Sequence, residues 1–217
     1  SASVIAATFV LYENLLNLVQ TKQERFERVQ TCERLQHGKG GAIDAASVVY
    51  GGVNRVEGAR VTQPDIAREH GLWRGKGWYW VLHGVPVSST GECVTAVRQS
   101  HGSDTALWQE FAQCTNALQS VLEANADPSE VLRHNQQLLT RIGVVPAQTQ
   151  GFISAVEGAG GSAKLCGAGS VRGDHGGVVL VHMEDPDAME TLMSKYAELR
   201  WEGLRIASAG AAQGAAP

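Results

Sequence analysis

Glycine is the feature that most constrains how this chain folds. Of its 217 residues 25 are glycine, and many of them gather in two segments. Residues 38–52 read GKGGAIDAASVVYGG, and residues 160–177 read GGSAKLCGAGSVRGDHGG. Glycine loses more backbone freedom on folding than any other residue, so such segments weaken a core unless backbone or a ligand must come close. Both segments are therefore candidates for a binding site.

Composition indicates a globular protein. Hydrophobic residues make up 43% of the chain and charged residues 18%, and the formal net charge is −4. This charge gives no general attraction to nucleic acid or to an anionic membrane. No apolar run approaches the roughly 18 residues that a membrane span needs. We expect a soluble cytoplasmic protein with no nucleic-acid or membrane partner, whose four scattered cysteines are free, buried thiols.

Hydrophobic periodicity and turn signals predict a mixture of helices and strands. Ser89 and Glu92 have the S-x-x-E form of a capping box, which opens a helix. Helices are expected over residues 2–19, 22–35, 89–100 and 103–122, from Pro128 onward, over 146–156, and again over 184–201. Strands are expected over residues 48–58, 78–85, 163–169, 176–183 and 203–210. This pattern predicts an α+β fold with an internal boundary near Pro86.

Two acids flank the first glycine-rich segment. Glu33 and Asp44 lie eleven residues apart, and the glycines exclude a continuous helix between them. Two carboxylates beside such a loop suit a magnesium ion and a hydroxyl that has to be oriented or deprotonated. The alternative is structural: Glu33 is a solvated charge at a helix end, and Asp44 caps a helix that begins at Ala45.

Three further features leave alternatives open. The glycines of residues 160–177 either cradle an anion such as a phosphate or form a glycine-rich hairpin, and they fit neither standard nucleotide-binding glycine pattern. The hydroxyl of Ser1 either caps the first helix or contacts a metal or phosphate at its positive end. His37 is either a hydrogen-bonded structural histidine or a ligand.

Together these features resemble the GHMP small-molecule kinases, and within them the mevalonate kinases. Residues 32–52, CERLQHGKGGAIDAASVVYGG, are similar to the signature G-E-R-x-x-H-G-x-P-S-G-[IV]-D-N-A-x-S-x-x-G-G. The opening SASVIAATFV resembles the helix that follows the family's phosphate loop. VPVSSTGECVTAVR and NQQLLTRIGV resemble VPxxTxxLVxxVR and N-x-x-L-L-x-x-L-G-V, and AKLCGAGSVRGDHGG resembles AKLTGAGGGG.

The resemblance implies the GHMP kinase fold. Residues 1–86 would be the remainder of the N-terminal domain, which is S5 domain 2-like, and residues 87–217 a ferredoxin-like α+β domain. The implied activity is ATP-dependent phosphorylation of the primary hydroxyl of mevalonate, a step of isoprenoid precursor biosynthesis. The implied cofactors are ATP and Mg²⁺.

The resemblance also implies roles for individual residues. Asp44 would be the catalytic base that faces the substrate hydroxyl, and Glu33 and Ser1 would hold magnesium. Thr90 and His37 would lie on the substrate side. The backbone of Gly167, Ala168 and Gly169, together with Ser1, would contact the nucleotide phosphates.

Several departures from the family pattern keep other interpretations open. GGAIDAA replaces P-S-G-[IV]-D-N-A, and Arg172, where glycines are usual, either reaches a phosphate or belongs to a surface insertion. The chain starts inside the phosphate-loop motif, so we expect an upstream part, which a separate polypeptide could supply. The family also forms homodimers. The alternatives are another GHMP kinase, the related decarboxylase, or a non-catalytic fragment.

Overall fold

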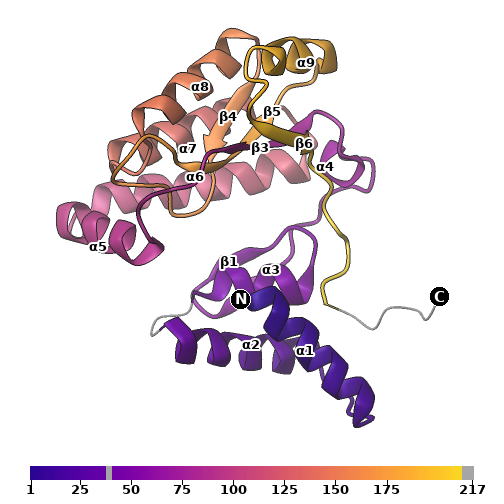
Figure 1. The fold of residues 1–217 in the computed structure, drawn as a ribbon. Coiled ribbons are helices and arrows are strands. Elements are labelled where there is room, and N and C mark those ends of the chain that lie inside the picture. Colours follow the sequence, from indigo (N-terminus) through magenta and orange to yellow (C-terminus); the bar gives the residue numbers. More distant parts are fainter. Residues whose placement is uncertain (38–40, 212–217) are drawn as a thin grey trace. The chain divides into compact units, whose positions relative to one another are not determined.

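The computed structural model describes residues 1–37 and 41–211, drawn in Figure 1. The chain divides into two compact units. The first comprises residues 1–65 together with the chain from Ile206 onward, and the second comprises residues 66–205. No helix in the described part of the chain combines the length and the apolar character that a membrane crossing requires.

Three helices form the body of the first unit: α1 (Ala2–Leu15), α2 (Lys22–His37) and α3 (Ala42–Tyr50). They pack against one another, and their small and apolar side chains make a core that includes Ala6, Val29 and Val49. A short antiparallel hairpin follows, built from β1 (Arg55–Glu57) and β2 (Arg60–Thr62). The unit is therefore a helical cluster with one small hairpin.

The C-terminal segment returns to the first unit and packs against Gly51 and Gly52, which explains why glycines stand at this end of the glycine-rich segment. The Gly52 amide donates to the Ala207 carbonyl at 2.7 Å, and the Ala211 amide donates to the Val48 carbonyl at 2.7 Å. A β-carbon on Gly51, whose φ is +65°, would lie 2.3 Å from the carbonyl carbon of Ala209. Glycine is needed there because another part of the backbone comes close.

A mostly buried ion pair joins α1 to α2. The Arg25 guanidinium binds the Glu13 carboxylate through two hydrogen bonds, and the two side chains are only 12% and 6% exposed. Arg25 also donates to the Ala211 carbonyl at 2.9 Å, so the same side chain holds the returning C-terminal segment.

The second unit is built on a four-stranded antiparallel sheet. Its strands are β3 (Trp78–His83), β4 (Ser162–Leu165), β5 (Gly177–His182) and β6 (Arg200–Gly203), in the order β4-β5-β3-β6. Because helices separate β3 from β4 and β5 from β6, the order is that of the split β-α-β arrangement of ferredoxin-like folds. The expected α+β class is confirmed.

Six helices accompany this sheet: α4 (Gly71–Arg74), α5 (Thr90–His101), α6 (Thr105–Glu123), α7 (Ser129–Arg141), α8 (Ala147–Gly158) and α9 (Pro186–Ser194). Figure 1 shows α5 to α8 following one another along the chain before it enters β4. Helices α7 and α8 pack against β4, and α6 packs against α7. Phe152 of α8 and Met189 of α9 close the main core over Val81, Val179 and Val181 of the sheet.

Most expected helices are present, but several expectations about local structure were wrong. Residues 48–50 end α3 instead of forming a strand, since Ala45, Ala46 and Val49 are buried at helical spacing. Helix α9 ends at Ser194, before the expected residue 201. The last strand is Arg200–Gly203, which pairs with β3, whereas residues 204–210 form no strand.

The two compact units are divided at a different place from the domain boundary expected near Pro86. Strand β3 precedes Pro86 but pairs along its whole length with β5, which comes from the C-terminal part of the chain. This pairing puts residues 66–86 in the second unit.

Candidate active site

Asp44 lies in the first turn of α3, on the first unit. The helix begins at Ala42, with Gly41 as its N-cap, so Asp44 does not cap a helix beginning at Ala45. Its side chain is exposed. A carboxylate in the first turn is favoured by the helix dipole, which carries partial positive charge at that end. Asp44 is thus a charged group on the surface, held by a packed helix whose neighbouring residues Ala45 and Ala46 are buried.

Glu33 lies near the end of α2 and is only 5% exposed. It follows Val29 by one helical turn, on the side of the helix that faces the core of the first unit. The interpretation of Glu33 as a solvated helix-end charge is therefore wrong.

Ser1 is the N-cap residue of α1 by its backbone. Its carbonyl accepts from the Ile5 amide at 3.1 Å, but its side chain makes no capping hydrogen bond. The alternative in which the hydroxyl caps the helix is therefore wrong, and the residue is exposed. His37 is the last residue of α2, but its side chain lies outside the described part of the structure, as do residues 38–40.

The second unit carries the other predicted residues. Thr90 is the first residue of α5 and is exposed. Gly167 and Gly169 have φ of +78° and +68°, a backbone conformation that favours glycine. A β-carbon on Gly169 would lie 2.2 Å from the Val144 carbonyl oxygen, whereas one on Gly167 would meet no atom within 4 Å. Gly169 is thus required for packing, and the backbone at Gly167 borders open space.

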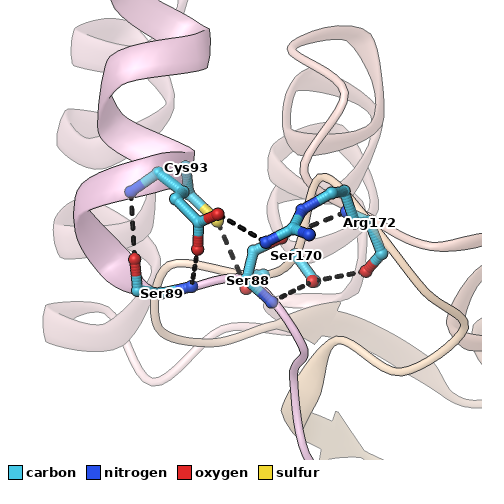
Figure 2. Close-up of polar contacts among 7 residues, drawn as sticks. Ser88, Ser89, Cys93, Ser170 and Arg172 are labelled. Atoms are coloured by element: carbon cyan, nitrogen blue, oxygen red, sulfur yellow. Dashed lines mark hydrogen bonds and ion pairs between the residues drawn. The ribbon is translucent and has the colours of Figure 1, made fainter.

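Hydrogen bonds from the start of α5 hold residues 169–172, as Figure 2 shows. The Ser88 amide donates to the Ser170 hydroxyl at 3.1 Å, and the Ser88 hydroxyl accepts from the Arg172 amide at 3.1 Å. Ser170 in turn donates to the Arg172 carbonyl at 2.6 Å. Because Ser88 and Ser170 are buried, at 6% and 2% exposure, water does not replace these bonds.

Two contacts extend this network along α5. The Cys93 thiol donates to the Gly169 carbonyl at 3.6 Å, and the Arg172 guanidinium pairs with the Glu92 carboxylate (Figure 2). Glu92 also accepts from the Ser89 amide at 2.7 Å, which completes the predicted capping box. Hydrogen bonds from the backbone and side chain of Ser89 lower the pKa of Glu92 below its ordinary value. Arg172 is therefore engaged by protein atoms.

A buried histidine fixes the far end of the same segment. Nδ1 of His83, at the end of β3, lies 3.1 Å from the Thr149 hydroxyl oxygen. The same hydroxyl oxygen accepts a hydrogen bond from the Gly176 amide at 2.9 Å. Burial and the neighbouring His175 lower the pKa of His83 below its ordinary value. Neutral His83 is thereby favoured, and its Nδ1 is then free to accept from Thr149.

Sequence reasoning missed Ser88, Ser170 and the Cys93 contact. Ser88 and Ser170 are 82 positions apart, and nothing in the local pattern of either segment indicates that they meet. The prediction of four free thiols is confirmed. The prediction that they are buried holds for Cys93 and Cys114, whereas Cys32 and Cys166 are half-buried.

The oxygen atoms of Glu33 and Ser1 are the kind of ligand that Mg²⁺ prefers. Within residues 1–37 and 41–211, no three side chains of His, Cys, Asp or Glu group together as a metal site. Mg²⁺ commonly uses one or two carboxylates and takes its other ligands from water and substrate phosphates, so a single buried carboxylate fits this ion better than a structural metal.

Comparison with solved structures identifies the fold. The chain is similar to L. major mevalonate kinase in complex with R-mevalonate, with a TM-score of 0.68 and 17% identity over 89% of this chain and 60% of that one. It is similar to Streptococcus pneumoniae phosphomevalonate kinase in complex with phosphomevalonate and AMPPNP, with a TM-score of 0.68 and 14% identity over 88% and 64%. For Lactococcus lactis galactokinase complexed with galactose, the TM-score is 0.70 and the identity 15% over 97% and 66%.

This chain has part of the GHMP kinase fold. It spans 60% to 66% of the length of these solved kinases. No protein-family model matches the sequence, and no curated protein is a significant match. The GHMP-like fold agrees with the resemblance of the sequence signatures.

Proposed function

We propose that this chain is the larger part of an ATP- and magnesium-dependent kinase that phosphorylates the primary hydroxyl of mevalonate. The observation that carries the proposal is the pair of acids in the first unit, the exposed Asp44 on α3 and the buried Glu33 on α2, within a signature of the mevalonate kinase type. The fold supports the kinase class, and the signature supports mevalonate.

In the proposed reaction, the hydroxyl oxygen of mevalonate attacks the γ-phosphorus of ATP. The Asp44 carboxylate accepts the proton of that hydroxyl. ADP leaves with the electrons of the broken bond. Thr90 helps to orient the substrate, and the backbone of Gly167–Gly169 contacts the nucleotide phosphates. Such catalysis depends mainly on positioning and electrostatics, because phosphoryl transfer needs little covalent help from the protein.

Glu33 and Ser1 are the residues proposed to hold magnesium. When bound, the ion neutralises charge that develops on the phosphate oxygens. Glu33→Gln removes the charge from this ligand with little change in size, so it should raise the magnesium concentration needed for half-maximal activity on the order of 10-fold or more. Glu27→Gln, an exposed position on the same helix, is the matched control. An unchanged magnesium titration would exclude the role of Glu33.

A substrate panel tests the proposed function. ADP release is measured with mevalonate, phosphomevalonate, galactose and homoserine in parallel, for the chain alone and within its full-length gene product. We expect turnover with mevalonate and none with the other three. Turnover with another alcohol would assign a different GHMP kinase. Absence of turnover in the full-length product would favour the non-catalytic alternative.

A further inference from the structure

A cavity of about 460 Å³ lies within the second unit, between α5, α6, α7 and the backbone at Gly167 and Ala168. Its volume falls within the range of sites that bind small molecules. Asp44, Glu33 and Thr90 do not line it, whereas Gly167 and Ala168, whose backbone is proposed to contact the nucleotide phosphates, form part of its wall. The proposed phosphoryl transfer therefore gives no role to the cavity walls on α5, α6 and α7.

The walls of the cavity are mainly apolar. Val97, Leu139, Ile142 and Val144 line its inner part, and Val94 and Trp108 line it while remaining 48% and 37% exposed. Large exposed apolar side chains around a cavity are typical of a ligand site, because water solvates them poorly. The body of a ligand should therefore be apolar.

The Trp108 ring is held in place. Its indole N–H donates to the His101 carbonyl at 2.8 Å, and its ring stacks on Phe111 with centroids 5.5 Å apart. Because its one polar group is already bonded within the protein, Trp108 presents an apolar surface to the cavity. A fixed aromatic wall lowers the entropy cost of binding a ligand.

Arg98 is the charged residue that lines this cavity. It lies one helical turn after Val94 on α5, is exposed, and forms no ion pair with any carboxylate in the described part of the chain. A guanidinium is a planar fork of donors that matches a carboxylate through two parallel hydrogen bonds. Its charge is complementary to an anionic group on an otherwise apolar molecule.

The floor of the cavity is part of the glycine-rich loop. Gly167 has open space where a side chain would lie, and Cys93, which lines the cavity, donates to the Gly169 carbonyl (Figure 2). An occupant would thus touch this loop at Gly167 and also touch the side chain that holds it at Gly169.

We propose that this cavity binds a small carboxylic acid with an apolar body, its carboxylate on Arg98 and its apolar part against Val97, Leu139 and Trp108. The site shares Gly167 and Ala168 with the proposed nucleotide contacts, but the side chains proposed to hold the acid take no part in the proposed kinase reaction. It is tested by binding alone, so a failure of either proposal leaves the other standing.

The probe is octanoate, titrated into the whole chain by isothermal titration calorimetry. We expect saturable binding at one site. Arg98→Gln should weaken it about 10-fold, because a charge-assisted hydrogen bond to the carboxylate is lost. Val94→Trp should abolish it by filling the cavity from an exposed position. Octanamide, which has the same apolar body without the charge, should bind wild type about as weakly as octanoate binds Arg98→Gln.

Matched controls separate the site from general effects. Thr95→Trp adds the same ring on the exposed side of α5, and Lys195→Gln removes one positive charge elsewhere on the second unit. Both should bind octanoate like wild type. The proposal is overturned if wild type shows no saturable binding, or if Arg98→Gln and Val94→Trp bind octanoate as tightly as wild type does.

Discussion

The two compact units hold their candidate functional groups in different ways. In the first unit, stability comes from a helical core and the buried Glu13–Arg25 pair, while Asp44 is exposed on the surface of α3. In the second unit, the glycine-rich loop is itself tied to the protein through the buried hydroxyls of Ser88 and Ser170. Asp44 is therefore separate from the packing of its unit, whereas residues 169–172 are part of the packing of theirs.

This difference determines what substitutions can reveal. A change at Asp44 should affect the reaction much more than folding, because no hydrogen bond or ion pair of the described residues depends on its side chain. A change at Ser170 should affect folding first, because two backbone groups depend on its hydroxyl. The predictions below test this contrast in order of decreasing effect.

Asp44→Asn is expected to have the largest effect. It keeps the size of the side chain but removes the proposed base, so the rate should fall on the order of 10²-fold or more. The measurement is the initial rate of ADP release with mevalonate, together with the urea midpoint, which should fall only slightly because the exposed carboxylate loses its interaction with the helix dipole. Asp187→Asn is the matched control, since Asp187 is likewise an exposed acid in the first turn of a helix. Near-wild-type turnover would rule out Asp44 as the base.

Arg25→Gln should destabilise the first unit by about 3 kcal/mol, because it leaves the Glu13 carboxylate buried without its partner. Far-UV circular dichroism during urea unfolding follows the helices of both units, whereas tryptophan emission follows the second unit alone, so a helix loss seen only in the first signal measures the unfolding of α1–α3. Arg28→Gln, exposed on the same helix, should have little effect. Equal unfolding midpoints for the two variants would show that the buried pair does not hold this unit.

Ser170→Ala should destabilise the second unit by about 2 kcal/mol, since it leaves the Ser88 amide and the Arg172 carbonyl without their buried partner. Tryptophan emission reports on this unit alone, because all five tryptophans lie within residues 66–205. Ser120→Ala, which removes an exposed hydroxyl bonded to a helix carbonyl, is the control. If both variants unfold at the same urea concentration, the loop is not held by Ser170.

Arg172→Gln should have the smallest effect. The Arg172 and Glu92 side chains are 60% and 46% exposed, and exposed ion pairs contribute little to stability. We expect a urea midpoint close to that of wild type, measured by the same tryptophan emission. A fall as large as that of Ser170→Ala would show that the ion pair, and not the hydroxyls, holds residues 169–172.

Much of the second unit could be predicted from the sequence because its signals are local. The capping box at Ser89 and Glu92 and the apolar stripe of α6 each depend on neighbours three or four residues away, and both are present.

In the first unit, the strand predicted at Val48-Val49-Tyr50 is wrong. β-Branched and aromatic residues favour strands, but here Ala45, Ala46 and Val49 are buried together on one face of a helix.

The candidate site was predictable only in part. The sequence signatures indicated Glu33 and Asp44 as a pair, but the burial of one and the exposure of the other depend on how α2 and α3 pack. The Ser88–Ser170 contact and the cavity beside Arg98 are made by segments far apart in the chain. Local pattern carries no information about such contacts.

The most direct test of the proposed function is the identity of the phosphorylated product. The full-length gene product is incubated with ATP, magnesium and mevalonate and followed by phosphorus NMR. The account predicts a new phosphomonoester resonance that appears together with ADP and depends on mevalonate. ATP consumed to inorganic phosphate alone, or a phosphomonoester formed with galactose and not with mevalonate, would contradict it.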